Sequence, residues 1–260
     1  MLKQHATLVI ENDNRALKSR SPTNFLYQLT QSIKFIKKSE KKQYYCRIEN
    51  IRIPISFYNI NSTNNSLSFL DGVTQETATI AEGNYTVDEL IAELQVQMNL
   101  QVTGTPYTLT YDDITQKINI ANSGANVLTI QNTTNLNVII GFDGAQTVAA
   151  SGNTNGNNIA YTNTIRHLKL QISNIVSNNL YSNDENLVTQ VQPIGVIIPI
   201  TEIRNEFQYY SNHQGPMIKL SNIMSVNEIN VKLLDPNNNI VSLNGVPFGF
   251  EIVFYEYNKQ

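Results

Sequence analysis

The 260-residue sequence predicts a mainly β protein, in which a β-sandwich is interrupted once by a small α+β insertion. Apolar and polar residues alternate with a period of two along much of the chain, which is typical of half-buried strands. Segments rich in Asn, Thr, Ser and Gly separate these strands, and Asn favours turns because its side chain bonds the local backbone. Only one segment, near residues 86–98, has a convincing helical pattern.

Residues 1–61 are expected to form an N-terminal arm and the first strands of the sandwich. The longest strand segment covers residues 44–60, and its apolar face changes from even-numbered to odd-numbered positions halfway along. One extra residue near Glu49 or Asn50 would shift the alternation in this way, so the sequence predicts a β-bulge there. The apolar residues are Cys46 and Ile48 before the bulge, and Ile51, Ile53, Ile55 and Phe57 after it.

Residues 62–160 are expected to form the α+β insertion, which contains the predicted helix. Thr86 is a favourable N-cap and Glu89 follows three residues later, which is the pattern of a capping box. The next apolar residues recur at helical spacing and form one stripe, so the helix is expected to cover a sheet. The stripe consists of Val87, Leu90, Ile91, Leu94 and Met98.

Short strands follow the helix and are expected to supply the sheet that it covers. The first two form a hairpin, with its turn at Asp112-Asp113. Ser151–Asn158, with the sequence SGNTNGNN, is expected to be a flexible linker that returns to the sandwich. The predicted strands are residues 107–111, 118–120, 127–130 and 138–142.

Residues 161–260 are expected to complete the sandwich. The apolar run 195–200 predicts a strand covered on both faces, and Pro199 places it at an edge, an end or a bulge because proline cannot donate to a ladder. Residues 235–239 are a predicted turn, after which residues 240–243 resume an extended run and form a hairpin into the last strand. Clear alternation predicts further strands at residues 168–173, 229–233 and 248–255.

No catalytic, cofactor-binding or metal-binding residues are predicted. The histidines are His5, His167 and His213. They lie far apart in the sequence without acidic or cysteine partners at ligand spacing, so they are expected at the surface or in turns. The sequence contains no nucleophile elbow, phosphate-binding loop, zinc-protease helix or dinucleotide fingerprint. The acidic pairs Asp112-Asp113 and Asp184-Glu185 have turn-like neighbours, which is typical of solvated carboxylates.

The low charge of the chain argues against a protein that binds nucleic acid or a membrane surface through its overall charge. Charged residues make up 15% of the chain and the formal net charge is -3, so long-range attraction to nucleic acid or anionic lipid is not expected. Lys34–Lys42 contains five lysines and one glutamate, which indicates a solvated loop that protects a sheet edge. Contact with packaged nucleic acid or an inner membrane is the alternative for this segment.

Cys46, the single cysteine, is expected to be a buried, unreactive thiol.

The first residues contain no apolar stretch long enough for a signal peptide, and the chain contains no membrane-spanning run. Synthesis in a cytosol is therefore expected.

A series of phrases along the chain points to one family. The phrases are TLVIENDNRALKSRSPTNFLYQLTQSIKF, IENIRIPISFYNI, AEGNYTVDELIAELQVQMN, YTLTYDDITQKINI, LNVIIGF and MIKLSNIMSVNEINVKLLDPNNNIVSLNGVPFGFEIVFYEY. Because these phrases occur in this order, the sequence resembles the vertex (penton) and minor capsid proteins of double-jelly-roll DNA viruses, including virophages and Polinton-like elements. The phrases cover most of the chain and include no catalytic motif.

The resemblance implies a single jelly-roll β-sandwich that forms the pentameric vertex of an icosahedral capsid. The expected partners are other copies of the chain in a homopentamer and the major capsid protein, and a vertex spike or minor capsid proteins are further candidates. The insertion would project outward, and the N-terminal arm would reach neighbouring capsomers. The resemblance implies no enzymatic activity, no cofactor, no specific nucleic acid and no transmembrane segment. The expected location is the virion, after synthesis in the host cytoplasm.

Other hypotheses remain open at this point. The chain could be a minor capsid or cement protein of the same shell. A β-sandwich adhesin on a virus surface or tail would use some of the thirteen tyrosines and the abundant asparagines to bind a glycan. A carbohydrate hydrolase would need two inward carboxylates about 5–10 Å apart, and the sequence nominates no such pair.

Overall fold

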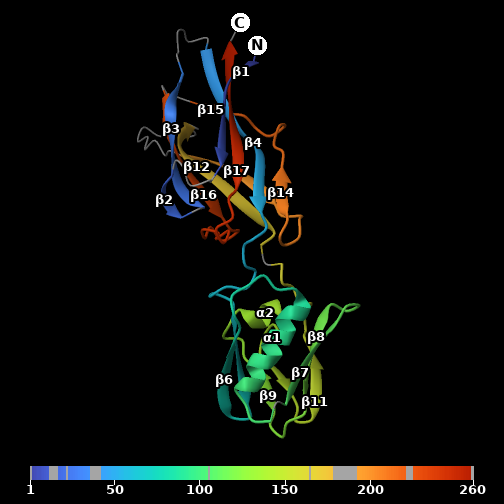
Figure 1. Cartoon of the computed structure of the whole chain (residues 1–260). Helices are drawn as coiled ribbons and strands as arrows, with labels where there is room; N and C mark the ends of the chain where they lie inside the picture. The colour runs from blue at the N-terminus through green and yellow to red at the C-terminus, as the bar shows by residue number, and fades with distance from the viewer. Residues whose placement is uncertain are drawn as a thin grey trace, which may run out of the picture. The chain divides into compact units, whose positions relative to one another are not determined.

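The structure is a computed structural model that describes residues 2–11, 17–21, 23–35, 42–104, 106–163, 165–177, 192–220 and 225–258 (Figure 1). The chain folds into two compact units. The first unit comprises Met1–Phe57 and Ile165–Gln260, and the second unit comprises Tyr58–Thr164. The second unit is therefore an insertion into the sequence of the first.

The first unit contains two antiparallel five-stranded sheets. One sheet has the order β1-β17-β4-β14, with β15 also pairing with β4, and the other has the order β13-β12-β16-β3-β2. The strands are β1 (Leu2–Glu11), β2 (Leu17–Ser21), β3 (Asn24–Lys34), β4 (Lys42–Pro54), β12 (His167–Ser177), β13 (Gln192–Pro199), β14 (Phe207–Tyr210), β15 (Ile218–Leu220), β16 (Ser225–Leu234) and β17 (Gly249–Asn258).

The order of pairing identifies the topology of the first unit. When β14 and β15 are taken as one interrupted strand and the short β2 is set aside, eight strands remain. β1 pairs with β17, β3 with β16, β4 with the interrupted strand β14 and β15, and β12 with β13. The first strand thus pairs with the last and so on inward, as in a long hairpin. Contacts of β17 with β4 and of β12 with β16 close the rolled hairpin into two layers. This is a single jelly roll, so the predicted fold class is confirmed.

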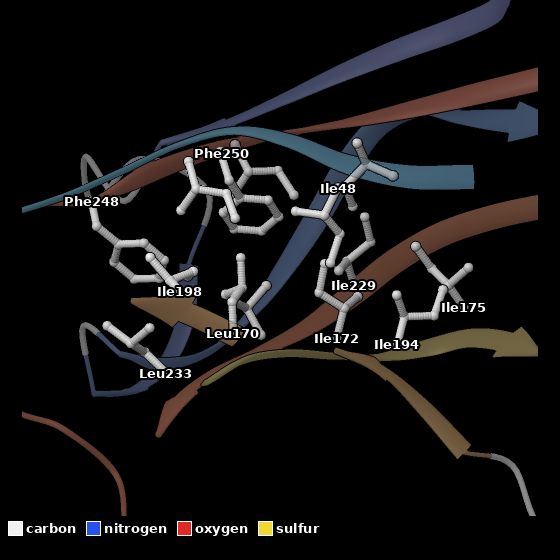
Figure 2. Packing of buried hydrophobic residues seen from close by; sticks show 14 of the residues in the cluster. Ile48, Leu170, Ile172, Ile175, Ile194, Ile198, Ile229, Leu233, Phe248 and Phe250 are labelled. Carbon is white, nitrogen blue, oxygen red and sulfur yellow. The ribbon is translucent and has the colours of Figure 1, made fainter. Parts of the chain in front are cut away.

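The two sheets of the first unit share one apolar core (Figure 2). Ile48 and Phe250 enter it from β4 and β17, and Leu170 and Ile229 enter it from β12 and β16. The alternation predicted for the last strand is confirmed, because Phe248, Phe250, Ile252 and Phe254 are all buried. Burial of a large apolar side chain contributes about 1.5–3 kcal/mol, so a core of this kind stabilises the sandwich without a disulfide.

The second unit packs helix α1 (Val87–Leu100) against β6 and β7, which belong to two small sheets. The predicted capping box is present, because the Thr86 side chain accepts from the Glu89 N–H and the Glu89 carboxylate accepts from the Thr86 N–H. The sheets have the orders β10-β9-β5-β6 and β11-β8-β7. The remaining elements are β5 (Ser66–Asp71), β6 (Thr74–Thr79), β7 (Tyr107–Asp112), β8 (Lys117–Asn122), β9 (Leu128–Ile130), α2 (Leu136–Ile139), β10 (Gln146–Val148) and β11 (Gly152–Asn155).

The strand predicted at residues 138–142 is wrong, because this run begins within the short helix α2. A short apolar run does not distinguish a helix from a strand by its periodicity. Both end residues of α2 and the following Ile140 are buried, at a spacing of three and four residues. The Asn137 side chain also donates to the Phe142 carbonyl at 2.9 Å, which holds the chain in a turn after the helix.

The linker predicted at Ser151–Asn158 is also wrong, because β11 within it pairs with β8. Amide side chains add to the ladder here, since Asn119 of β8 donates to the Asn155 side chain at 2.8 Å. An Asn-rich and Gly-rich segment has a weak strand propensity, and the neighbouring strand supplies the pairing that its composition does not predict.

Two expectations for the C-terminal half need correction. All but the last residue of the run 195–200 lies in β13, which is an edge strand and ends at Pro199 as predicted. It is covered on one face only, because Ile197 is exposed between the buried Ile194 and Ile198. Residues 240–243 form no strand and contribute a single bridge to β16, although two of their side chains are buried in the core.

The described strands of the segment expected to contain an N-terminal arm belong to the two sheets of the first unit. β1 pairs with β17 from Leu2, opposite Tyr257, to Glu11, opposite Gly249. β3 pairs with β16 in the other sheet. Ala6, Leu8 and Ile10 alternate toward the core, so the first residues already carry the pattern of a strand.

Candidate assembly surface

The outward face of the sheet β1-β17-β4-β14 is the face turned away from the core, and a bulge in β4 shapes it. The pairing of β4 with β17 shifts register between Glu49 and Arg52, and Asn50 has a φ of 48°. Asn tolerates this left-handed conformation better than most residues. The bulge predicted near Glu49 or Asn50 is therefore confirmed. Because a slip of one residue exchanges the two faces of a strand, Arg47 and Glu49 before the bulge and Arg52 after it all point outward.

A charged network lies on the outward face around Glu49, which is buried. Arg47 donates to one carboxylate oxygen from Nε at 2.6 Å, and the Tyr255 hydroxyl donates to the same oxygen at 2.9 Å. His213 Nδ1 lies 2.6 Å from the other oxygen. A buried carboxylate is stable only when it is paired and hydrogen-bonded, and these three partners meet that requirement.

The network shifts the pKa values of its members in opposite directions. Burial of Glu49 would raise its pKa, but the hydrogen bonds from Arg47, Tyr255 and His213 outweigh burial and hold the pKa below its usual value. Burial raises the pKa of Tyr255, and its hydrogen bond to Glu49 raises it further. Glu49 is therefore ionised and Tyr255 neutral at neutral pH.

Beside the network, the outward face has a hollow with a volume of about 360 Å³. Asn50 donates to the Glu251 carboxylate at 2.7 Å, and Arg52 lies 3.7 Å from the Glu11 carboxylate. The hollow is lined in part by Val9, Glu11, Asn50, Arg52, Tyr209 and Glu251. Its charged groups are thus two carboxylates and one guanidinium.

Apolar side chains border the hollow and are open to solvent. Tyr209 is 70% exposed and Val9 is 54% exposed. The Arg52 guanidinium lies 5.4 Å from the centre of the Phe207 ring, so an aromatic side chain also supports the charged part of the hollow. Exposed aromatic and aliphatic groups around fixed polar groups are typical of protein–protein contact surfaces.

The three histidines are distributed as expected, except that one has an acidic partner. His5 is exposed on β1, His167 begins β12, and His213 is exposed in the connection between β14 and β15. The partner of His213 is Glu49, and the sequence does not indicate this pairing because the two residues are 164 positions apart. The available signal was the pair Arg47 and Glu49, two residues apart on one face of an otherwise apolar strand, because buried charges need partners.

The other residues considered for chemistry have structural surroundings. Cys46 is a buried free thiol, and burial raises its pKa to about 12, so the expectation of an unreactive thiol is supported. Asp112 accepts from the Ile114 N–H at 2.9 Å in the β7–β8 turn, as its turn-like context predicts. Asp184-Glu185 and residues 36–41 of the segment Lys34–Lys42 lie outside the described residues.

In the part of the chain that the structure describes, no group of three or more His, Cys, Asp or Glu side chains could hold a metal ion. Among the helices of the same described ranges, none is long and apolar enough to cross a bilayer.

Comparison with known proteins supplies a likeness of fold. No protein-family model matches the sequence, and no curated protein matches it. The crystal structure of the mavirus penton protein aligns with a TM-score of 0.54 and 12% identity, over 97% of this chain and 99% of that chain. A chain in the cryo-EM structure of the Sputnik virophage aligns over 96% of this chain and 98% of that chain with 12% identity. Its TM-score of 0.39 is too low to establish a shared fold. Over nearly its whole length, the chain has a fold similar to that of the mavirus penton protein.

Proposed function

We propose that this chain is a structural virion protein that forms the pentameric vertex of an icosahedral capsid. It does so by assembling with copies of itself and by docking to the major capsid protein. The observation that carries this proposal is the likeness of fold to the mavirus penton protein, which covers 97% of this chain and 99% of the other. Jelly rolls serve many functions, so a jelly roll alone would say little. A likeness that also includes the second unit is more specific.

The physical properties of the first unit are compatible with a ring. A closed ring of identical subunits needs a head-to-tail interface, in which two different surfaces of each copy meet. The formal net charge of -3 produces little repulsion between copies. The outward face around the hollow combines exposed apolar groups with fixed charges, which suits contact with protein.

In this proposal the two domains have different roles. The jelly roll of residues 1–61 and 161–260 makes the ring contacts, and the α+β insertion of residues 62–160 is left for other partners, such as a vertex spike or minor capsid proteins. The protein acts in the virion after synthesis in the host cytoplasm, and it performs no enzymatic step.

Mass photometry of the purified full chain over a range of concentrations tests the proposal. We expect a species of about 146 kDa, which is five times the 29.3 kDa chain mass. Addition of the major capsid protein should then yield particles that retain this chain. A chain that stays monomeric or trimeric and binds glycans on an array would contradict the proposal and support an adhesin. A chain that joins particles without forming pentamers would indicate a minor capsid or cement protein.

A further inference from the structure

The first unit has a hollow with two carboxylates on one outer surface of its sandwich and a pair of lysines on the other. The hollow on the outward face of β1-β17-β4-β14 has the carboxylates of Glu11 and Glu251 against the single guanidinium of Arg52. Its net charge is therefore negative. Glu11 is well exposed and Glu251 is half-buried, so a cation of another molecule can reach both carboxylates.

The outer surface of the other sheet carries a pair of lysines, Lys169 and Lys232. β12 and β16 pair with Gln171 opposite Lys232 and Lys169 opposite Leu234, so the two lysines are diagonal neighbours on one surface. The residues on either side of each lysine are buried in the core, which directs both lysines away from it. Lys169 donates to the Pro236 carbonyl at 2.8 Å and to the Asn238 side-chain oxygen at 3.0 Å, which holds its ammonium group near the end of β16. Within the described part of the chain, the third N–H of this ammonium group is left for another molecule.

The hollow and the lysine pair lie at the same end of the sandwich. Leu233, next to Lys232, and Phe248, just before β17, lie on the same side of the packed residues labelled in Figure 2. Gly249 at the start of β17 and Glu251 shortly after it line the hollow. The two charged regions thus occupy opposite surfaces of the sandwich at about the same level.

We propose that the hollow of one copy receives the lysine pair of the next copy around the ring. This inference rests on the proposed function, because a closed ring of identical copies brings two different surfaces of neighbouring copies together head to tail. Surfaces at the same level of a subunit can meet around a closed ring without a shift along its axis. A twofold contact between two hollows would instead bring four carboxylates together, which like-charge repulsion disfavours.

The apolar border of the hollow fits the same occupant. A lysine packs its four-carbon stem on apolar surface while its ammonium group pairs with a carboxylate. Val9 and Tyr209 supply this apolar surface beside the carboxylates. A second copy therefore complements the hollow in both charge and polarity.

A charge exchange tests the inference with the full chain. Glu251→Lys alone and Lys232→Glu alone should each raise the concentration at which half of the pentamer dissociates by on the order of tenfold, because each places like charges in contact. The double variant Glu251→Lys/Lys232→Glu should restore dissociation to about the wild-type concentration. Glu82→Lys makes the same substitution at an exposed position of the second unit and should leave the pentamer unchanged.

Each outcome decides between the two proposals. A wild-type chain that forms no pentamer overturns both. A wild-type pentamer whose single variants dissociate normally, or whose double variant is no better than the singles, overturns only this inference. If a charge variant fails to fold, a photo-crosslinker in place of the exposed Tyr209 gives a second test. Crosslinks to β12 or β16 of the neighbouring copy support the inference, and crosslinks confined to other strands overturn it.

Discussion

Replacing Glu49 by Gln tests whether the charged network on the outward face stabilises the first unit. Gln keeps the size of the side chain but removes the negative charge that Arg47 faces. The side chains of Arg47 and Glu49 are 11% and 6% exposed, so the substitution leaves a cation with little access to water. Loss of one partner of a buried ion pair costs about 3–5 kcal/mol. The remaining exposure of Arg47 places the expected loss of unfolding free energy at the lower end, about 3 kcal/mol.

Two further variants calibrate this magnitude. His213 is 54% exposed, and exposed ion pairs contribute about 0–1 kcal/mol, so His213→Ala should cost less than about 1 kcal/mol. Arg47→Met/Glu49→Leu replaces both charges by apolar groups of similar size. This double variant should recover part of the loss seen in Glu49→Gln, because no unpaired charge stays buried.

The loss of unfolding free energy in Glu49→Gln should also depend on pH in a defined direction. The native fold lowers the pKa of Glu49, so its stabilisation is present above the unfolded-state pKa of about 4.3 and is lost as the pH falls through the lower folded-state pKa. The difference between wild type and Glu49→Gln should therefore be largest above about pH 5 and shrink in acid. This difference in unfolding free energy is measured by guanidinium unfolding followed by circular dichroism. Hydrogen exchange of peptides from β4 and β17 shows whether the loss is in this sheet. A loss below about 1 kcal/mol, or one that is constant with pH, would refute the reasoning.

Three smaller perturbations test individual elements. Thr86→Ala removes the side-chain cap of α1 and should destabilise the second unit by about 1 kcal/mol, seen as faster hydrogen exchange in the helix. Asn50→Val should be about 1–2 kcal/mol less stable than Asn50→Gly in thermal unfolding, because both variants lose the hydrogen bond to Glu251 but only the branched residue strains at positive φ. Cys46 should react with a thiol reagent only as the protein unfolds, and rapid labelling of the native protein would show that the thiol is accessible.

Features that depend on neighbouring residues could be predicted from the sequence. The bulge in β4 followed from the switch of apolar positions around Asn50, because a one-residue insertion leaves a visible change in alternation. The cap of α1 followed from the spacing of Thr86 and Glu89. Where local composition was ambiguous, the predictions were wrong. α2 and β11 owe their conformations to tertiary packing and to a neighbouring strand, which a short window does not contain.

The pairing of the strands could not be derived from alternation, because each strand pattern fits many partners. The jelly roll entered only through the resemblance of phrases along the chain. The network on the outward face was missed for a related reason. His213 and Glu49 are 164 residues apart, and the connection between β14 and β15 brings them together. The hollow likewise needs the bulge, β1 and β14 in one place, which only the folded sheet provides.

Cryo-EM of particles made by co-expressing this chain with a double-jelly-roll major capsid protein tests the central claim most directly. We expect density for five copies of the jelly roll around each fivefold axis, with a second unit attached to every copy. Particles whose vertices are empty, or in which this chain occupies only positions between other capsomers, would contradict a role as the vertex protein.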